Sequence, residues 1–445
     1  MTNTASRFQK DNRSLDAYWM PFTPNRQFKA DPRILVGAKG VYYESDDGRS
    51  ILDGTGGLWC CNAGHGHQEI ADAVHRQLIS LDYAPSFNIS HDSAFDFAER
   101  LTALAPENIN HVFFTNSGSE SVDTALKIAL AYHKAKGDAG RTRLIGRERA
   151  YHGVGFGGIA VGGIVSNRRQ YGALIAGVDH IRHTHDLEHN AFSKGQPAWG
   201  AHLADDLERM VALHGADTIA AVIVEPVACA TGVLIPPQGY LQRLRDICDR
   251  HGILLIFDEV VTAFGRLGTA FAADYFDVIP DLICTAKGLT NGVMPMGAVF
   301  AQSHVYDAVT NEPKDGIELF HGYTYSGHPT ACAAGLATLN IYEREGIFQN
   351  AAELAPHFES ALHSLKSVSN VKDIRNLGLV GAVELDSRSG TPGQLGFDVY
   401  KACYETGVLV RPIGDIIALS PPLTISESEI DQMISLLGTA IKNVS

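Results

Sequence analysis

The chain has no hydrophobic run long enough to cross a membrane. Its longest wholly nonpolar stretch, residues 153–165, is far shorter than the roughly 20 residues that a transmembrane helix needs. Six of the residues in this stretch are glycine, which indicates close backbone packing or a ligand site instead. Residues 1–20 are polar and lack the apolar core of a signal peptide. We therefore expect a protein that does not associate with membranes.

An excess of positive charge is also missing. The sequence of 445 residues has 36 Lys and Arg against 50 Asp and Glu, a formal net charge of −14. Such a chain has no general attraction for nucleic acid or anionic lipid, so we expect neither as a partner. The seven cysteines form no CxxC pair, and their odd number leaves at least one unpaired. We expect buried thiols and a reducing, cytoplasmic compartment.

The middle of the chain alternates short apolar, β-branched runs with amphipathic helical patterns. Residues 218–224 predict a buried strand, residues 240–248 a helix, and residues 253–257 the next buried strand. A helical crossover makes two such strands parallel and their connection right-handed. Further strands are predicted at 281–286 and 297–302. The pattern favours an α/β fold with a mostly parallel central sheet and helices on both of its faces.

The two ends of the chain have different patterns. Residues 1–59 carry turn signals and aromatic side chains, whereas residues 332–445 alternate helices with short strands such as 408–411. We therefore predict two domains. The large domain covers residues 60–331, and a small α+β domain is assembled from both termini, residues 1–59 and 332–445.

A Gly/Ser turn follows the strand predicted at 111–115 and opens a helix. Ser117 and Glu120 have the spacing of a capping box. The free N–H groups and the positive end of the helix dipole would suit a phosphate at Gly118 and Ser119. A well-capped helix without any ligand explains the same pattern, so this motif alone does not decide between the two.

Two further candidates follow buried strands. Asp258 lies at the carboxyl end of the strand 253–257, where open α/β sheets bind ligands, and Val260 points the same way in an extended chain. This pair could bind a protonated ring nitrogen and pack on the ring, or Asp258 could cap the next element. Lys287 leaves the strand 281–286 into a Gly-rich turn. Burial there would lower its pKa and provide a nucleophilic amine, although most lysines are surface residues.

Taken together, these features meet the needs of one cofactor. A phosphate site, a carboxylate for a ring nitrogen and a lysine for an aldehyde are what pyridoxal phosphate (PLP) requires. The chain resembles the class III aminotransferases of the fold-type-I PLP enzymes, and among them the ω-amino acid:pyruvate and β-alanine:pyruvate aminotransferases. The stretches that carry the resemblance are 18–23, 57–59, 115–120, 151–153, 224–226, 257–260, 285–288, 321–329 and 408–412.

The resemblance implies a role for each matching residue. Lys287 would hold the cofactor's aldehyde and move a proton between the donor carbon and the cofactor, while Asp258 would keep the ring nitrogen protonated. The other residues implied to contact the cofactor are Gly118, Ser119, Tyr151, His152, Glu225, Val260 and, from a neighbouring subunit, Thr324. The residues implied to line the substrate pocket are Phe22, Trp59, Phe87 and, as the carboxylate-binding group, Arg411.

The implied reaction has an amine donor and a 2-oxo acid acceptor. An amino group would pass from an ω-amino acid or amine, β-alanine first among them, to pyruvate, giving L-alanine and an aldehyde or oxo acid. The implied assembly is a homodimer or a dimer of dimers. Cys229 and the segment 411–417 depart from the family pattern and leave the donor open.

Several alternatives stay open at this point. Within class III they are a diamine– or taurine–pyruvate aminotransferase, a decarboxylating transaminase and an aminomutase. A nicotinamide dehydrogenase is a weaker alternative, because the Gly-rich stretch 153–163 lacks the βαβ context and the acidic residue of a dinucleotide site. No metal site is expected at His65, His67 and Glu69, since no further ligand cluster accompanies them.

Overall fold

The central feature of the fold is a seven-stranded sheet. The computed structural model describes residues 14–311 and 315–444, so the first part of the predicted segment 1–59 lies outside it. The strand order is β4-β10-β9-β8-β7-β5-β6. Only β10 runs antiparallel to its neighbours, which confirms the mostly parallel sheet. The strands are β4 (Ile109–Thr115), β5 (Arg143–Arg147), β6 (Val178–Ile181), β7 (Ile219–Val224), β8 (Leu254–Asp258), β9 (Leu282–Thr285) and β10 (Gly297–Gln302).

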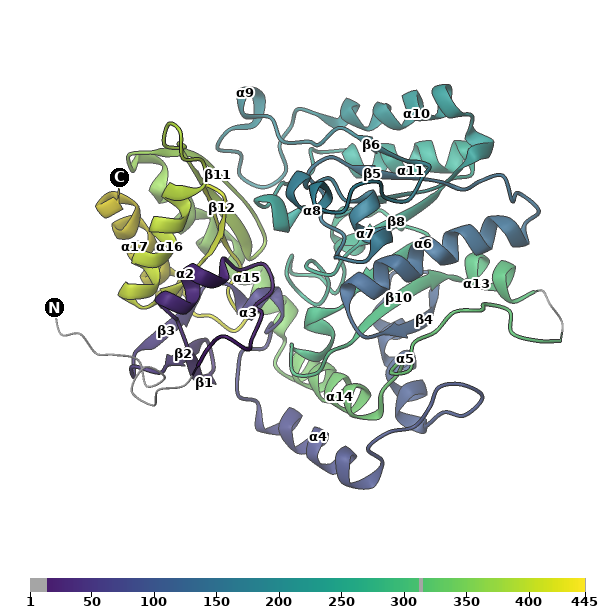
Figure 1. Cartoon of the computed structure of the whole chain (residues 1–445), viewed down its shortest axis with the longest axis horizontal. Helices are drawn as coiled ribbons and strands as arrows, with labels where there is room; N and C mark the ends of the chain where they lie inside the picture. Colours follow the sequence, from purple (N-terminus) through teal and green to yellow (C-terminus); the bar gives the residue numbers. More distant parts are fainter. Residues whose placement is uncertain (1–13, 312–314, 445) are drawn as a thin grey trace.

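Helices cover both faces of this sheet (Figure 1). Side chains alternate along each strand, so Ile223 and Ile256 face α6, whereas Val222 and Leu255 pack with α11. The predicted crossover β7-α11-β8 is present, and its two strands are parallel as expected. The helices of this part of the chain are α4 (Gln68–Ser80), α5 (Asp92–Leu104), α6 (Gly118–Ala135), α7 (Phe156–Val161), α8 (Val165–Arg169), α9 (Leu187–Asn190), α10 (Asp206–His214), α11 (Tyr240–His251), α12 (Ala272–Phe276), α13 (Ser303–Thr310) and α14 (Pro329–Arg344).

Both ends of the chain build a second body beside the central sheet (Figure 1). In a four-stranded sheet, β13 from the C-terminal part pairs in parallel with β3, with Val408 opposite Leu52. A second sheet has the order β11-β12-β15-β14. The elements are α2 (Asn25–Ala30), β1 (Leu35–Lys39), β2 (Tyr42–Ser45), β3 (Ser50–Asp53), α3 (Gly56–Trp59), α15 (Ile347–His363), β11 (Val371–Leu377), β12 (Val380–Leu385), α16 (Gln394–Thr406), β13 (Val408–Leu409), β14 (Arg411–Ile413), β15 (Ile416–Leu419) and α17 (Glu427–Val444).

Two features of the structure differ in detail from the sequence pattern. The predicted strand 408–411 is divided, because β13 pairs with β3 while β14 pairs with β15 of the other sheet. Arg411 therefore begins a strand instead of ending one. The predicted domain boundary between residues 331 and 332 falls inside α14, a continuous helix that packs on α4 and α5. The domain limits stay a prediction.

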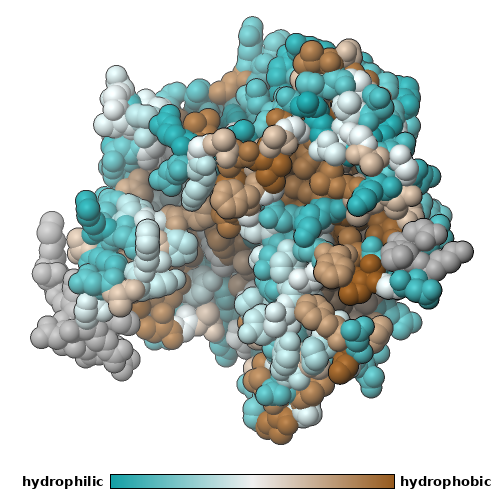
Figure 2. All heavy atoms as spheres, turned by 45° about the vertical axis from the view of Figure 1, so that its right-hand side comes forward, coloured by the Kyte–Doolittle hydropathy of each residue, from teal (hydrophilic) through white to brown (hydrophobic). Residues whose placement is uncertain are grey.

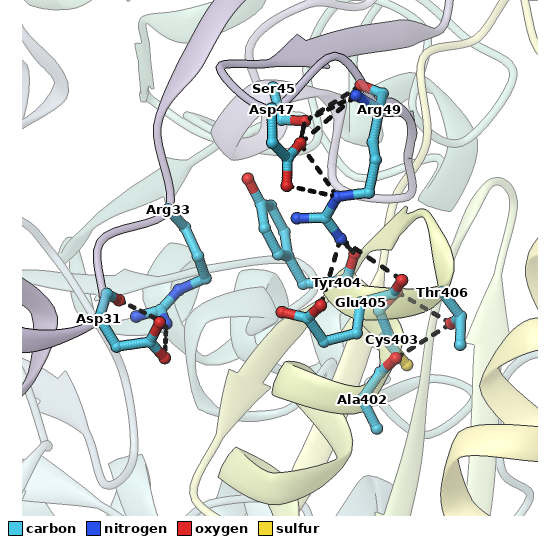
Figure 3. Close-up of polar contacts among 10 residues, drawn as sticks. All are labelled: Asp31, Arg33, Ser45, Asp47, Arg49, Ala402, Cys403, Tyr404, Glu405 and Thr406. Carbon is cyan, nitrogen blue, oxygen red and sulfur yellow. Dashed lines mark hydrogen bonds and ion pairs between the residues drawn. The ribbon is translucent and has the colours of Figure 1, made fainter. Parts of the chain in front are cut away.

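Arg49 illustrates how the N-terminal strands are fixed to the C-terminal part (Figure 3). Its Nε donates to the carboxylate of Asp47 at 2.8 and 3.0 Å, and its Nη1 donates to the carbonyl oxygen of Tyr404 at 3.0 Å. The guanidinium also lies 5.1 Å from the centroid of the Tyr404 ring. One side chain thus donates a hydrogen bond to a carbonyl group in the last turn of α16 and links segments that are far apart in sequence.

The structure shows the state of the cysteines and the length of the apolar helices. All seven cysteines are free thiols, five of them buried, and Cys60 and Cys61 are partly buried. Among residues 14–311 and 315–444, no helix is long and apolar enough to cross a membrane.

Candidate functional site

A cavity of about 630 Å³ lies at the carboxyl ends of β7, β8 and β9, where residues of the N- and C-terminal parts complete its wall. Figure 2 shows apolar side chains gathered where this face of the molecule is hollowed. Ten of the predicted site residues line the cavity: Phe22, Trp59, Gly118, Ser119, Tyr151, Glu225, Asp258, Val260, Lys287 and Arg411. The structure thus brings together residues that are spread over nearly the whole chain.

Lys287 stands at the start of a short 3₁₀ turn, η4 (Lys287–Thr290); the residue is partly exposed in the cavity, while its amine is desolvated by the surrounding protein. Its backbone has φ 51°, a left-handed conformation that is uncommon for a residue other than glycine. The Nζ atom lies 4.9 Å from the centroid of the Trp59 ring, and none of the described residues forms a hydrogen bond or an ion pair with it. Burial lowers the pKa of Lys287. The site therefore holds a buried, unpaired amine that loses its proton more easily than an ordinary lysine.

Asp258 ends β8 and is held from behind by His152. The Oδ2 atom of Asp258 lies 2.8 Å from Nδ1 of His152, and the N–H of Val260 donates to Oδ1 at 3.2 Å. His152 is itself buried, and its Nε2 has no hydrogen-bond partner among the described residues. Because the imidazole lies outside the cavity wall, it can orient the carboxylate of Asp258 without contacting a ligand in the cavity.

Glu225 follows β7 and is the second buried carboxyl group of the site. The N–H of Tyr151 donates to Glu225 Oε1 at 2.9 Å, and Arg147 Nη2 donates to the Glu225 carbonyl oxygen at 2.8 Å. Burial raises the pKa of Glu225 to about 7, and the nearby charge of Asp258 acts in the same direction. Glu225 thus fixes the backbone at Tyr151 while holding its own proton at higher pH than usual.

The Gly/Ser turn forms a capped helix start, as predicted, with one difference. Ser117 Oγ accepts a hydrogen bond from the N–H of Glu120 at 3.2 Å. The Glu120 carboxylate, however, accepts from the N–H of Asn116 at 2.7 Å instead of from that of Ser117. The reciprocal bond of the capping box is therefore displaced by one residue, because the Asn116 amide group also donates to the same oxygen at 2.9 Å.

Close packing at the start of α6 explains why glycine stands at position 118. A Cβ atom on Gly118 would lie 2.9 Å from Cγ2 of Val260, nearer than such atoms approach. Ser119 accepts a hydrogen bond on Oγ from the N–H of Val154 at 3.1 Å. The amino end of an 18-residue helix consequently opens onto the cavity beside Val260.

Arg411 presents a guanidinium to the cavity without a counter-charge. Its Nε is buried and has no hydrogen-bond partner, and no carboxylate of the described residues lies within 4.0 Å of it. Burial lowers the pKa of Arg411. The alternative that this arginine is part of a structural ion pair finds no support in residues 14–311 and 315–444.

Three predicted residues do not line the cavity of their own chain: His152 lies behind Asp258, and Phe87 and Thr324 lie elsewhere. Phe87 and Thr324 are exposed and lie in segments that contact each other: Tyr83 donates its hydroxyl to the Thr324 carbonyl oxygen at 3.0 Å, and a Cβ on Gly322 would lie 3.1 Å from the Phe87 ring. The roles of Phe87 and Thr324 stay predictions, and the loop of Phe87 is held against the segment of Thr324.

Sequence reasoning missed one wall of the cavity. Arg149 lines it and donates from Nη2 to the carbonyl oxygen of Thr231 at 3.1 Å. Thr231 closes a 3₁₀ turn, η3 (Cys229–Thr231), whereas Cys229 itself packs inward with Trp59. The position of Arg149 after β5, at the carboxyl end of a parallel strand, was a signal that could have identified it.

Comparison with known proteins identifies the family. The Aminotransferase class-III family matches residues 25–441 of the chain. The chain belongs to the class III aminotransferases. An omega-aminotransferase of Caulobacter vibrioides is 58% identical over 430 residues, which cover 97% of this chain and 98% of that protein. A beta-alanine–pyruvate aminotransferase of Pseudomonas aeruginosa is 49% identical over 97% of both chains.

Solved structures agree with this family. The crystal structure of an amine transaminase from an uncultivated Pseudomonas species, in its PLP-bound form, has a TM-score of 0.88 at 39% identity, over 97% of this chain and 100% of that one. The predicted fold class, enzyme class and PLP cofactor are confirmed. The residues present fit this group, since the cavity combines an unpaired buried lysine, an oriented carboxylate and a helix amino end.

The raised pKa of Glu225 generates a test of stability against pH. The folded carboxyl group titrates at about 7 and the unfolded one near 4.5. Between these values only the unfolded chain releases the proton, so the free energy of unfolding should fall as pH rises through this window, by about 3 kcal/mol, and level off above pH 7. Glu225→Gln cannot ionise and can still accept from Tyr151, so this part of the slope should disappear.

Urea unfolding of the cofactor-free protein at a series of pH values measures the slope. The exposed Glu343→Gln serves as control and should leave it unchanged. The buried Glu259, whose pKa burial also raises to about 7, is present in all three proteins and leaves a residual slope. A variant at Glu225 with the wild-type slope would contradict the prediction.

Proposed function

We propose that this enzyme transfers the amino group of an ω-amino acid or amine, β-alanine first among them, to pyruvate, giving L-alanine and an aldehyde or oxo acid. The observation that carries the proposal is the unpaired guanidinium of Arg411 in the same cavity as the buried amine of Lys287. A substrate with an amine or ketone at one end and a carboxylate at the other would satisfy both groups. The relatives named for omega-amino groups and for beta-alanine and pyruvate support this substrate class.

The residues of the chain divide the work around the cofactor. When bound, PLP supplies an electron sink next to the carbon that gains or loses the amino group. Asp258, held by His152, would keep a proton on the ring nitrogen, and Tyr151 and Val260 would enclose the ring. Lys287 would anchor the aldehyde and carry a proton to and from the substrate carbon.

The remaining contacts would hold the phosphate and the substrate. The amino end of α6 at Gly118 and Ser119 would bind the phosphate through its free N–H groups and the helix dipole. Trp59 and Phe22 would pack against the apolar part of the donor, and Arg411 would bind the carboxylate of pyruvate or of an ω-amino acid.

Substitution of Lys287 tests the reaction itself. Lys287→Ala should lose the yellow absorbance of a lysine-bound cofactor and at least about 10³-fold in turnover, because the anchor and the proton carrier disappear together. Lys287→Arg should not restore activity, since a guanidinium stays protonated. Absorbance spectra and L-alanine production measure the two effects. Near-normal turnover of the Ala variant would exclude this mechanism.

Substitution of Arg411 tests the substrate assignment. Arg411→Ala should weaken the pyruvate half-reaction by roughly 2–4 kcal/mol, the range for losing a charge-assisted, two-point contact. The half-reaction with an amine that lacks a carboxylate, followed by bleaching of the cofactor absorbance, should change much less. Equal losses in both half-reactions would show that Arg411 supports the fold instead.

We also propose that the active unit is a homodimer or a dimer of dimers, in which Thr324 reaches the phosphate of the neighbouring subunit and Phe87 reaches its substrate pocket. The support is that both residues are exposed and lie outside the cavity of their own chain, beside exposed aromatics such as Phe320 and Tyr325.

The free thiols of all seven cysteines support a reducing, cytoplasmic location.

Mixing two inactive variants tests the exchange of Thr324 between subunits. Lys287→Ala and Thr324→Asp should each be inactive as pure proteins, because one lacks the amine and the other repels the phosphate. A mixed dimer should regain one intact site, with the lysine of one subunit and the threonine of the other. Activity that does not reappear after co-refolding, with mixed dimers verified by mass, would show that Thr324 does not act across the interface.

A further inference from the structure

The cavity contains a second guanidinium that the reaction described above does not use. Arg149 lines the wall formed by the loop after β5 and by η3. The one hydrogen bond of its guanidinium goes from Nη2 to the carbonyl oxygen of Thr231 at 3.1 Å, and no carboxylate of the described residues lies within 4.0 Å of it. Its backbone has φ 59°, so the chain adopts an unfavourable conformation at this residue.

An unpaired hydroxyl lies on the same wall. Thr231 is 9% exposed and lines the cavity, yet its Oγ1 is buried and has no hydrogen-bond partner among the described residues. A buried hydroxyl without a partner lowers stability, so its presence beside a free guanidinium calls for a ligand. A carboxylate fits both groups, because it accepts from the guanidinium and from the hydroxyl.

Glu384, the acidic side chain whose charge acts on Arg149, is already engaged by other cations. Glu384 binds Arg375 at 2.8 Å and His185 at 3.3 Å, and the ammonium of Lys372 lies 3.8 Å away. Asp373 binds the same Arg375 at 2.6 Å. Both carboxylates thus form ion pairs with other cations, and neither forms one with Arg149.

The two free guanidiniums occupy different positions. Arg411 begins β14 and its charge acts on Tyr151, whereas Arg149 follows β5 and the charges of Arg375 and Glu384 act on it. In pyruvate the carboxylate is bonded directly to the reacting carbon, but in a long ω-amino acid it is several methylene groups away from the amine. The two carboxylates therefore lie at different distances from the reacting carbon, and two guanidiniums at different positions could each bind one of them.

We propose that Arg149 and Thr231 form a second carboxylate-binding position in this cavity, which takes the carboxylate of long-chain ω-amino acid donors while Arg411 takes that of pyruvate. The proposal rests on the proposed function, of which it specifies the donor class.

Donor selectivity tests the proposal. Arg149→Gln and Thr231→Val should each lower kcat/KM for 6-aminohexanoate relative to kcat/KM for 1-phenylethylamine, by at least about tenfold for Arg149→Gln and about threefold for Thr231→Val, mainly through KM. The exposed Arg209→Gln on α10 is the control and should leave the ratio unchanged. Equal losses for both donors would show a structural role and overturn the proposal.

Two measurements that do not depend on turnover complete the test. Thr231→Val removes an unpaired hydroxyl, so it should raise the melting temperature while weakening the long donor, whereas lower stability would show that the hydroxyl supports the fold. Calorimetric titration of the holoenzyme with hexanoate, which cannot react, should give a Kd at least about fivefold weaker in Arg149→Gln than in the wild type. If no donor is turned over with pyruvate, the proposed function fails, and the hexanoate titration still decides the binding position: an unchanged Kd overturns it.

Discussion

The convergence of strand ends at one edge of the central sheet is the constraint on which this site depends. Because β7, β8 and β9 are parallel and adjacent, Glu225, Asp258 and Lys287 leave the sheet at the same edge. The antiparallel β10 contributes its amino end there, with Gly297 opposite Thr115 of β4. A Cβ on Gly297 would lie 2.5 Å from the hydroxyl oxygen of Ser121, so this glycine lets α6 approach the edge with its amino end.

That convergence has an electrostatic cost. Two carboxyl groups and one amine are buried within a single cavity wall, and only Asp258 has a close side-chain partner, His152. Burial raises the pKa of Glu225 and lowers that of Lys287, so each group is shifted toward its neutral form. The strained φ of Lys287 adds to the cost. Extensively buried strands and helices on both faces of the sheet stabilise the arrangement.

The sequence was informative where periodicity and chemistry coincide. The strand patterns at 218–224 and 253–257 predicted the parallel pair, and the position of Asp258 at the sheet edge follows from that pairing. The turn at Gly118 and Ser119 and the position of Lys287 followed from the same reasoning, because strand ends are recognisable from apolar runs that stop at a polar residue. The family resemblance added Tyr151, Trp59 and Arg411, which no periodicity marks.

What the sequence did not reveal depends on loop conformation and on assembly. Arg149 follows a recognisable strand end, but its entry into the cavity depends on a left-handed backbone conformation that a local sequence pattern does not mark. Phe87 and Thr324 reach no cavity within one chain, and a single sequence does not state where the surface of a neighbour lies. The division of the strand 408–411 arises from a change of pairing partner between β3 and β15, which is a tertiary choice.

This division has a chemical consequence. By leaving one sheet after Leu409 and entering the other at Arg411, the chain passes along the cavity with Val410 buried and the guanidinium in the wall. Trp59 lines the same wall from the end of α3, which follows β3. The strand β3 is the one with which β13 pairs in parallel. Arg411 and the aromatic side chain of Trp59 are therefore fixed to one another by the parallel pair β3-β13. This wall of the cavity thus depends on the joining of the two chain ends, whereas Glu225, Asp258 and Lys287 follow strands of the central sheet.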